Sequence, residues 1–581
     1  DVYKRQILED GTVVIFQVRP LAAALKIIAP MTDREFKDTK ALAKCKYLDT
    51  FHILSDMAFW NPAEIIGSNP RPLDYSLYRE LITAHIWSAG LQPLGYQPVR
   101  GELMQKVGNK PYISVNYTFD GLTPAGLPED LCYKLNQYYE QKLRQDKTAH
   151  DKIEFEIIFN TYDFMTDTRL KELAEYGFDD VEISRLRNAL FEIAKQTLEH
   201  YDEICEEDLR SLGQLTELRH ELRKHSPLAE TNVMKLYSYI DELLDSIKDH
   251  GTPQFTRQAR CAFMARSFCR TLVEKGYFTK QEMDDFMLSI PTVASEFERD
   301  FDLYSHGKLS RDDFNHLYGH LRLGTYDIRS DSYRNIYFDV ASANLTGNNK
   351  VKQEAKSLDL ERLQVALDEA GIPVTPEKFI EFIKKATQNR EYFKFEFTKS
   401  LSLMLDVIVK LGEVMAIARE DMSYLEIQDL LSYHSRDSYI QTIETRRRFY
   451  HVNSYLVLPE VIFDVGDIDV IDIDEARPNF ITNKVVEAPI VNLDEDHDSD
   501  ITGKIVVLTK ADPGYDWIFA KDIAGFVTKY GGAASHMAIR CAEFGIPAAI
   551  GCGEKIYQRI HRMQIMCLDC ENGRITEKQS Q

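Results

Sequence analysis

A chain of 581 residues is too long for one hydrophobic core and predicts about two to four domains. Its hydrophobic content of 44%, with 11% aromatic residues, is ample for globular burial, and no apolar run approaches the length of a membrane span. The net charge of −22 argues against nucleic-acid partners and anionic membranes, and nine cysteines without framework spacing favour a reducing cytoplasm.

The first element is a strand within residues 11–20, which ends in Gln17-Val-Arg19-Pro20. No partner strand is predicted nearby, and residues 1–6 fit no recognisable pattern. We therefore interpret the strand as part of a domain whose other strands are not in this segment. An ordinary edge strand with one exposed Arg is the alternative.

Residues 32–450 are dominated by helical periodicity, with apolar residues at i, i+3, i+4 or i+7 and charged opposite faces. The most apolar helix is expected at 400–417, in the centre of this region. One exception is the alternating segment 110–119, which predicts a strand of a small inserted sheet. Further helices are expected at 170–176, 182–201, 233–247 and 360–370.

Two polar clusters in this helical region are candidate acceptor-binding sites. The first contains Trp60 and Asn61, which could line a substrate pocket, although turn and capping roles also explain the Asn. The second is a loop with His320, Arg322 and Asp327, a residue combination that can hold an oxyanion. An Arg322–Asp327 ion pair that fixes the loop is an equally good interpretation.

After about residue 450 the composition becomes strand-rich, beginning with apolar segments at 455–459 and 461–465. The acidic segment 492–500 predicts a solvated loop, since it lacks the glycine and terminal Glu of an EF-hand. Strands are then expected at 503–508, 523–528, 546–551 and 564–568. Together they predict a compact α/β domain over 451–581.

The most informative segment lies inside that domain. Gly531 and Gly532 form a turn after the strand at 523–527, and Ser535 is placed to N-cap a helix from His536 to Phe544. The helix N-terminus provides free N–H groups and a positive dipole end, which favour a neutral imidazole and a bound anion. We therefore expect an exposed, uncharged His536. An ordinary polar loop residue is the alternative reading of a lone His.

This string, running from Thr528 through Gly531-Gly532 and Ser535-His536 to Gly551, resembles the phosphohistidine swivelling domain of phosphoenolpyruvate-utilising enzymes. The resemblance implies that His536 is the phosphorylated residue. Gly531, Gly532, Ser535 and Arg540 would then contact the phosphoryl group. Arg540 lies one turn beyond His536, and a surface Arg paired with Glu543 or Glu554 is its alternative role.

The Gln-x-Arg-Pro strand likewise resembles the last strand of an ATP-grasp domain. That resemblance would give Gln17 and Arg19 contacts to the phosphates of ATP, and Gln17 a contact to Mg²⁺. The expected order is an ATP-grasp remnant at 1–31, a mostly helical acceptor-binding domain at 32–450 and the swivelling domain at 451–581. We expect an N-terminally truncated chain that is inactive alone and does not bind ATP.

This order is similar to that of the rifampicin phosphotransferase family. Synthases and dikinases that act on pyruvate add a (β/α)₈ barrel, which we do not expect after Gln581. The expected activity is transfer of a phosphoryl group from ATP through His536 to a small-molecule acceptor. A phosphoenolpyruvate synthase-like activity on pyruvate and a non-catalytic phosphocarrier are the alternatives, and the sequence does not indicate the oligomeric state.

Overall fold

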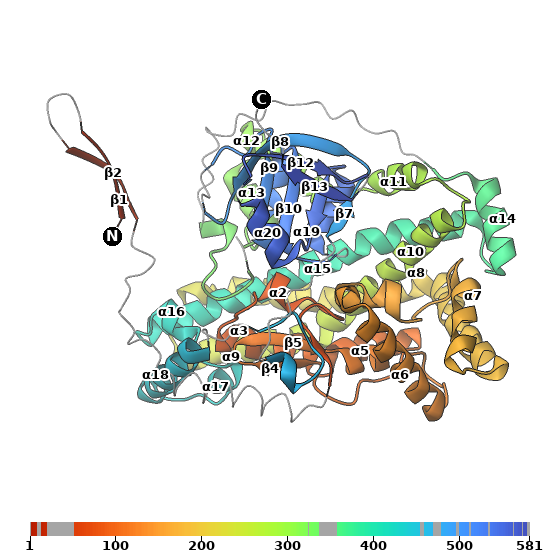
Figure 1. Ribbon diagram of the computed structural model, residues 1–581. Helices are drawn as coiled ribbons and strands as arrows, with labels where there is room; N and C mark the ends of the chain where they lie inside the picture. The colour runs from red at the N-terminus through yellow and green to blue at the C-terminus, as the bar shows by residue number, and fades with distance from the viewer. Residues whose placement is uncertain are drawn as a thin grey trace.

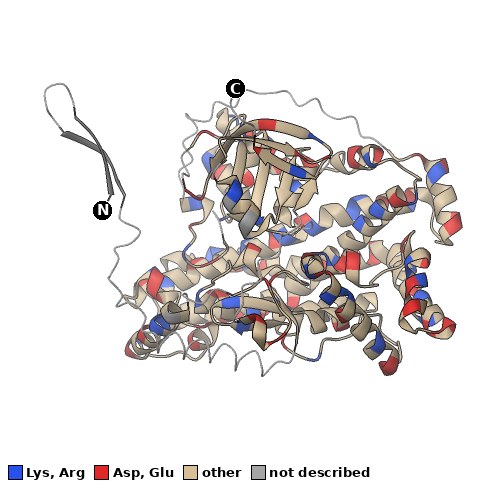
Figure 2. Ribbon diagram, in the orientation of Figure 1, with Lys and Arg blue, Asp and Glu red and all other residues tan. Residues whose placement is uncertain are grey.

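The computed structural model describes residues 2–7, 13–19, 52–322, 325–335, 357–453, 458–468, 478–495, 499–510, 513–532, 535–561, 563–571 and 573–577. It is mainly helical, and a C-terminal unit built around a sheet lies against long helices (Figure 1). Acidic and basic residues are interspersed along the chain in both parts (Figure 2). No helix within these ranges has the length and apolar character needed to cross a membrane.

The helical part contains helices of very different length, from single turns to 45 residues in α8. They are α2 (Pro62–Ile65), α3 (Pro72–Tyr78), α4 (Ile86–Leu91), α5 (Val115–Leu122), α6 (Glu129–Gln145), α7 (Thr166–Arg169), α8 (Asp180–Lys224), α9 (Val233–His250), α10 (Thr252–Glu274), α11 (Lys280–Leu288), α12 (Val293–Ser305), α13 (Arg311–Tyr318), α14 (Leu360–Ala370), α15 (Pro376–Val414), α16 (Arg419–Met422), α17 (Ile427–Leu431) and α18 (Arg436–Asn453).

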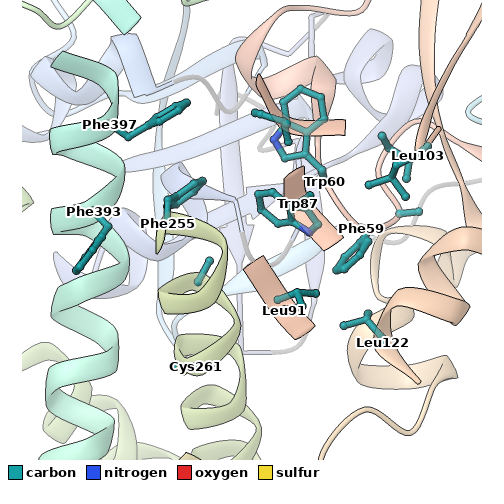
Figure 3. Close-up of a cluster of buried hydrophobic side chains, with 14 of the residues drawn as sticks. Phe59, Trp60, Trp87, Leu91, Leu103, Leu122, Phe255, Cys261, Phe393 and Phe397 are labelled. Carbon is teal, nitrogen blue, oxygen red and sulfur yellow. The ribbon is translucent and has the colours of Figure 1, made fainter. Parts of the chain in front are cut away.

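Helix α15 is the centre of the helical part, because it packs against α8, α9 and α10. The apolar helix expected at 400–417 forms its C-terminal half, and Leu401, Leu405 and Leu411 are fully buried there. Aromatic rings continue this core toward the N-terminal segment. Figure 3 shows Trp87, Phe255 and Phe397 in sequence across it, with ring centroids 6.0 and 5.9 Å apart.

A four-stranded antiparallel sheet, with order β4-β5-β3-β6, lies at the edge of the helical part. Its strands are β3 (Leu54–Ser55), β4 (Met104–Val107), β5 (Lys110–Ser114) and β6 (Val461–Ile462). The strand expected at 110–119 is therefore only half right. The hydroxyl of Ser114 accepts a hydrogen bond from the backbone N–H of Tyr117. This N-cap starts α5 at Val115 and thereby ends the strand.

The position of β6 corrects the expectation that the strand-rich segment after residue 450 belongs to the C-terminal domain. Val461–Ile462 pairs with β3, and Lys110 and Tyr112 both donate hydrogen bonds to the carbonyl of Pro459. Residues 458–468 therefore belong with the helical part. We propose that the boundary between the two units lies after Ile468 instead of at 451.

The C-terminal unit has a seven-stranded sheet in the order β13-β12-β8-β9-β10-β11-β7. The four central strands, β8 to β11, are parallel, and the flanking strands are antiparallel. A hydrophobic cluster lies on each face, one of them under α19 (His536–Glu543) and the other under α20 (Gly553–Ile560). The strands are β7 (Asn479–Ile481), β8 (Val485–Asn492), β9 (Ile505–Lys510), β10 (Gly525–Tyr530), β11 (Ala548–Ile550), β12 (Ile565–Asp569) and β13 (Arg574–Glu577).

At the N-terminus, β1 (Val2–Ile7) pairs antiparallel with β2 (Val13–Arg19). This pairing corrects the expectation of a strand without a nearby partner, and it places residues 2–6 in a strand. Gln17 lies opposite Lys4, and Arg19 opposite Val2. The side chains of Gln17 and Arg19 lie outside the described part of the structure, so their nucleotide and metal roles stay predictions.

The buried ion pair between α8 and α15 gives a test of how the long helices are held together. The Arg219 guanidinium, 2% exposed, donates to Oε2 of Glu396 at 2.8 Å and to Oγ of Ser400 at 3.1 Å. We expect Arg219→Met to lower the free energy of unfolding by about 1–3 kcal/mol, because the buried carboxylate of Glu396 loses one of its two cations and keeps only Lys399. Urea denaturation followed by far-UV circular dichroism measures the loss. Arg185→Met, on the exposed face of the same helix, is the control and should change stability little, and equal effects of the two variants would contradict the argument.

Candidate active site

The histidine motif folds as the sequence predicted. Strand β10 is followed by Gly531, whose φ of 139° is a conformation favoured by glycine, and the Oγ of Ser535 accepts a hydrogen bond from the N–H of Ala538. Helix α19 then runs from His536 to Glu543, and Gly545 follows it with a φ of 61°. The site therefore lies at the carboxyl end of a central parallel strand, where α/β sheets commonly place ligand sites.

The outer residues of the motif hold this turn in place. The hydroxyl of Thr528 accepts a hydrogen bond from the N–H of Gly551 at 3.2 Å. A Cβ atom at Gly551 would stand 2.2 Å from the carbonyl oxygen of Gly531, so only glycine fits there. The distant end of the motif thus shapes the loop that precedes His536.

His536 is surrounded by carboxylates from both parts of the chain. Its Nε2 lies 2.7 Å from Oδ1 of Asp516 in the C-terminal unit, and its Nδ1 lies 3.3 Å from Oε2 of Glu391 on α15. Its backbone N–H donates to Oε1 of Glu64 on α2 at 3.0 Å. The anion position at the start of α19 is thus filled by a carboxylate of the helical part, which stands where an anionic ligand would bind.

These contacts correct the expectation of an exposed, neutral imidazole. His536 is only 6% exposed. Burial lowers the pKa of His536, but the charges of Asp516 and Glu391 outweigh burial and raise the pKa to about 9. The helix dipole favours a neutral ring, but the carboxylates of Asp516 and Glu391 lie 2.7 and 3.3 Å from the ring nitrogens, and their effect outweighs that of the dipole. In this docked arrangement His536 is an imidazolium at neutral pH.

Asp516, in the 3₁₀ segment η10 (Pro513–Ala520), is shared between His536 and Arg540. The guanidinium of Arg540 lies 3.4 Å from Oδ1 of Asp516 and 3.3 Å from Oε2 of Glu543, and it stacks on the ring of Phe544. Arg540 is fully buried, so the alternative of a surface Arg is wrong, while its pairing with Glu543 is present. It positions Asp516 in this state, and its contact with a phosphoryl group stays a prediction.

Sequence reasoning missed the partners that α15 and α2 bring to the site. Lys394 on α15 lies 3.7 Å from Oε1 of Glu64, and Arg390 lies one turn before it. The available signal was three charged residues, Arg390, Glu391 and Lys394, on one face of a helix that is otherwise rich in buried aromatic residues. Charged residues that are spaced along a buried helix face mark a polar contact with another element.

The two residues of the first polar cluster do lie beside the histidine loop. Trp60 and Asn61 line a cavity of about 120 Å³ together with Gly532, Ser535 and residues of α10 and α15. Asn61 also caps α2 through the N–H of Glu64, as its alternative role suggested. A second cavity of about 50 Å³ contacts His536 itself. Both are smaller than ordinary small-molecule sites of about 300–1,000 Å³, so the docked C-terminal unit closes this region.

The second polar cluster does not reach these cavities. Arg322 is fully buried and binds Ser402 and Asp406, while Asp327 pairs with Arg329. The expected Arg322–Asp327 pair is therefore wrong. Burial, with nearby cations, holds the pKa of His320 well below its usual value, and its ring packs edge-on against Phe395. Neither cavity beside His536 is lined by these three residues, and an acceptor role for them stays untested.

Within the described ranges, no group of three or more His, Cys, Asp or Glu side chains is arranged to hold a metal ion. The carboxylates around His536 are occupied by the imidazole, Arg540 and Lys394. No metal ligands can therefore be assigned here, and the expected Mg²⁺ contact of Gln17 lies outside the described side chains.

Comparison with known proteins finds similarity in the same region. Residues 501–573 match the family model described as PEP-utilising enzyme, mobile domain. The chain is also 28% identical over 222 residues to rifampicin phosphotransferase of Bacillus subtilis, and 26% identical over 212 residues to rifampicin phosphotransferase of Bacillus cereus. These alignments cover 35% and 33% of this chain, and each covers 24% of the relative, so the chain spans about a quarter of the length of the relatives it matches.

The raised pKa of His536 predicts a pH-dependent contact between the two parts of the chain. Because the folded pKa of about 9 exceeds the ordinary value of 6.5, the stabilisation is complete below about pH 6.5 and is lost as the pH rises through about 9. Histidine-selective NMR should show one resonance titrating near pH 9. It should disappear in His536→Asn and move to lower pH in Glu391→Gln. A His536 midpoint near 6.5 would contradict the carboxylate contacts.

Proposed function

We propose that the chain is a member of the PEP-utilising enzyme family and acts in ATP-dependent phosphoryl transfer of the dikinase type, with His536 as the phosphoryl carrier. The observation that carries the proposal is the start of α19, where the backbone N–H of His536 binds an oxyanion, the carboxylate of Glu64, beside a potential nucleophile. The similarity to rifampicin phosphotransferases supports a phosphotransferase of kinase or dikinase type.

In the proposed first step, an unprotonated nitrogen of His536 attacks a phosphorus atom of ATP. Attack at the β-phosphorus forms the N–P bond, breaks the α–β phosphoanhydride bond and releases AMP, which leaves a pyrophosphoryl group on the ring. Water then cleaves the remaining phosphoanhydride bond, which releases phosphate and leaves one phosphoryl group on His536. The second step passes the phosphoryl group to a nucleophilic oxygen of the acceptor, and the N–P bond breaks. A covalent carrier separates these two transfers and keeps the acceptor away from the nucleotide.

The docked state is a resting state in this scheme. An imidazolium has no free lone pair, so His536 must lose a proton before it can attack phosphorus. Glu391 and Glu64 belong to the helical part and would be left behind when the C-terminal unit moves, whereas Asp516 travels with His536. Loss of Glu391 lowers the pKa of the imidazole, and Asp516 keeps the ring oriented through Nε2.

We place the acceptor in the cavity lined by Trp60 and Asn61. Its walls include Ser535 and Gly532 from the histidine loop, together with the cations Arg390 and Lys394. Positive side chains beside the transfer position can stabilise charge on a phosphoryl group in flight. Withdrawal of the C-terminal unit would open this cavity for a small-molecule acceptor, and its return would enclose the reactants.

Replacement of the proposed carrier gives the direct test. Incubation of the full-length protein with ATP labelled in the β-phosphoryl group should label His536, and the label should be lost in acid and retained in alkali, as expected for a phosphoimidazole. His536→Ala should abolish labelling and transfer. His561→Ala, at a partly exposed site of the same unit, is the control and should label normally. Label that survives acid, or that persists in His536→Ala, would refute the proposal.

Lys394 provides a test that separates the two steps. We expect Lys394→Met to lower transfer to the acceptor by about 10²-fold or more, because a cation beside the transfer position is lost. Labelling of His536 by ATP should be nearly unchanged, since Lys394 lies in the helical part. Transfer is followed with pyruvate and with a panel of hydroxylated metabolites. A variant that fails equally in both steps would show that Lys394 is not specific to the acceptor site.

A further inference from the structure

The largest of the cavities described here is separate from the one assigned to the acceptor. It has a volume of about 630 Å³ and lies between α10, α11, α15 and the C-terminal unit. This volume falls in the usual range for small-molecule sites, about 300–1,000 Å³. His536 does not line it, and Phe263 stands in the wall that it shares with the smaller Trp60 cavity.

One wall of this cavity carries an arginine without an anionic partner. Within the described part of the chain, the Arg266 guanidinium makes no hydrogen bond or ion pair, and it lies 5.9 Å from the centre of the Phe155 ring. Arg270, one turn further along α10, lies 5.5 Å from the same ring and contacts Glu274 at 3.5 Å. Burial, with the like charges of Arg390 and Arg270, lowers the pKa of Arg266 to about 10.

The acidic residues of the lining do not neutralise Arg266. Glu391 is bound to His536, Glu543 to Arg540 and Glu274 to Arg270, while Asp285 accepts a hydrogen bond from Gln281. Asp284 on α11 faces the same cavity, but it lies beyond ion-pair distance of Arg266, and burial raises the pKa of Asp284. Arg266 is half-buried, and a guanidinium that lines a cavity without a counterion is a position where a ligand anion would replace lost hydration.

The remaining wall of the cavity is apolar and comes from both parts of the chain. Met283 and Met287 of α11 face the space beside Phe263, and flexible thioethers adapt readily to ligands of different shape. Ile539 of α19 closes the opposite side. A ligand of this cavity would therefore need an anionic group for Arg266 and an apolar body for the methionines, and it would touch both units at once.

We propose that this cavity binds a small organic anion with an apolar body, whose carboxylate or phosphate group contacts Arg266 and Arg270. The ligand is distinct from the phosphoryl acceptor. Because it contacts α11 and α19 together, it holds the C-terminal unit in the docked position and slows its departure. The proposal concerns regulation of the carrier, and binding itself does not depend on phosphoryl transfer.

Calorimetry with octanoate and octyl phosphate tests the binding step on the whole chain. If the site recognises only the negative charge of the headgroup, both probes should bind saturably at one site. If the site distinguishes a carboxylate from a phosphate, only one of the two probes should bind. Octanol and inorganic phosphate should bind at least tenfold more weakly, since octanol lacks the anionic group and inorganic phosphate lacks the apolar body. Arg266→Met should weaken binding by about 10- to 100-fold, the loss expected for a charged hydrogen bond.

Two further variants keep the test decisive. Met287→Trp fills the cavity and should abolish binding of both probes, while Arg185→Met leaves the cavity untouched and should bind as the unchanged protein does. Thermal melting confirms that each variant is folded. Hydrogen exchange should slow in both α11 and α19 when the probe is bound. Equal affinity of octanol, unchanged binding in Arg266→Met, or no protection in α19 would each overturn the proposal, whatever the outcome of His536 labelling.

Discussion

The imidazolium of His536 held between carboxylates is the interaction on which the arrangement of the two units depends. Asp516 comes from the same unit, while Glu391 and Glu64 come from the helical part. Removal of one member of such a buried set leaves an uncompensated charge, which costs several kcal/mol. The contact is therefore strong only while the ring carries its proton and the carboxylates stay ionised.

A phosphoryl group on this ring would reverse the sign of the interaction. A phosphorylated imidazole brings negative charge to the position where Glu64 and Glu391 already stand, and like charges at this distance repel in a site with little water. Lys394 offsets only part of that charge. The carboxylates that attract the unmodified histidine would thus repel the phosphorylated one. This repulsion alone would favour departure of the C-terminal unit after phosphorylation.

Local features of the site could be predicted from the sequence, because they depend on neighbouring residues. The glycine turn, the Ser535 cap and the start and end of α19 follow from backbone preferences and are all present. The ionisation of His536 could not be predicted in this way. Burial lowers the pKa of His536, while Asp516, 20 positions earlier, and Glu391, 145 positions earlier on a helix of the other unit, raise it, and no local pattern reports such contacts.

The helical part shows the same division between local and distant information. The helix at 360–370 was predicted with its observed limits, since an amphipathic pattern and the Asp359 cap are both local. The segment 461–462 was assigned to the wrong sheet, because a short apolar strand carries no information about its partner. Arg322 and Asp327 were correctly placed in one loop, yet each binds a different neighbour.

Phe263 has a further consequence, because its ring lines both the cavity of about 120 Å³ and the cavity of about 630 Å³. Rotation of this ring would therefore change the shape of both cavities at once. The size of molecule that fits beside Ser535 is then determined by a rotamer, which exchanges far faster than a domain moves. Movement of the C-terminal unit and rotation of the Phe263 ring would thus change the same space on very different timescales, and the ring rotation is the faster of the two.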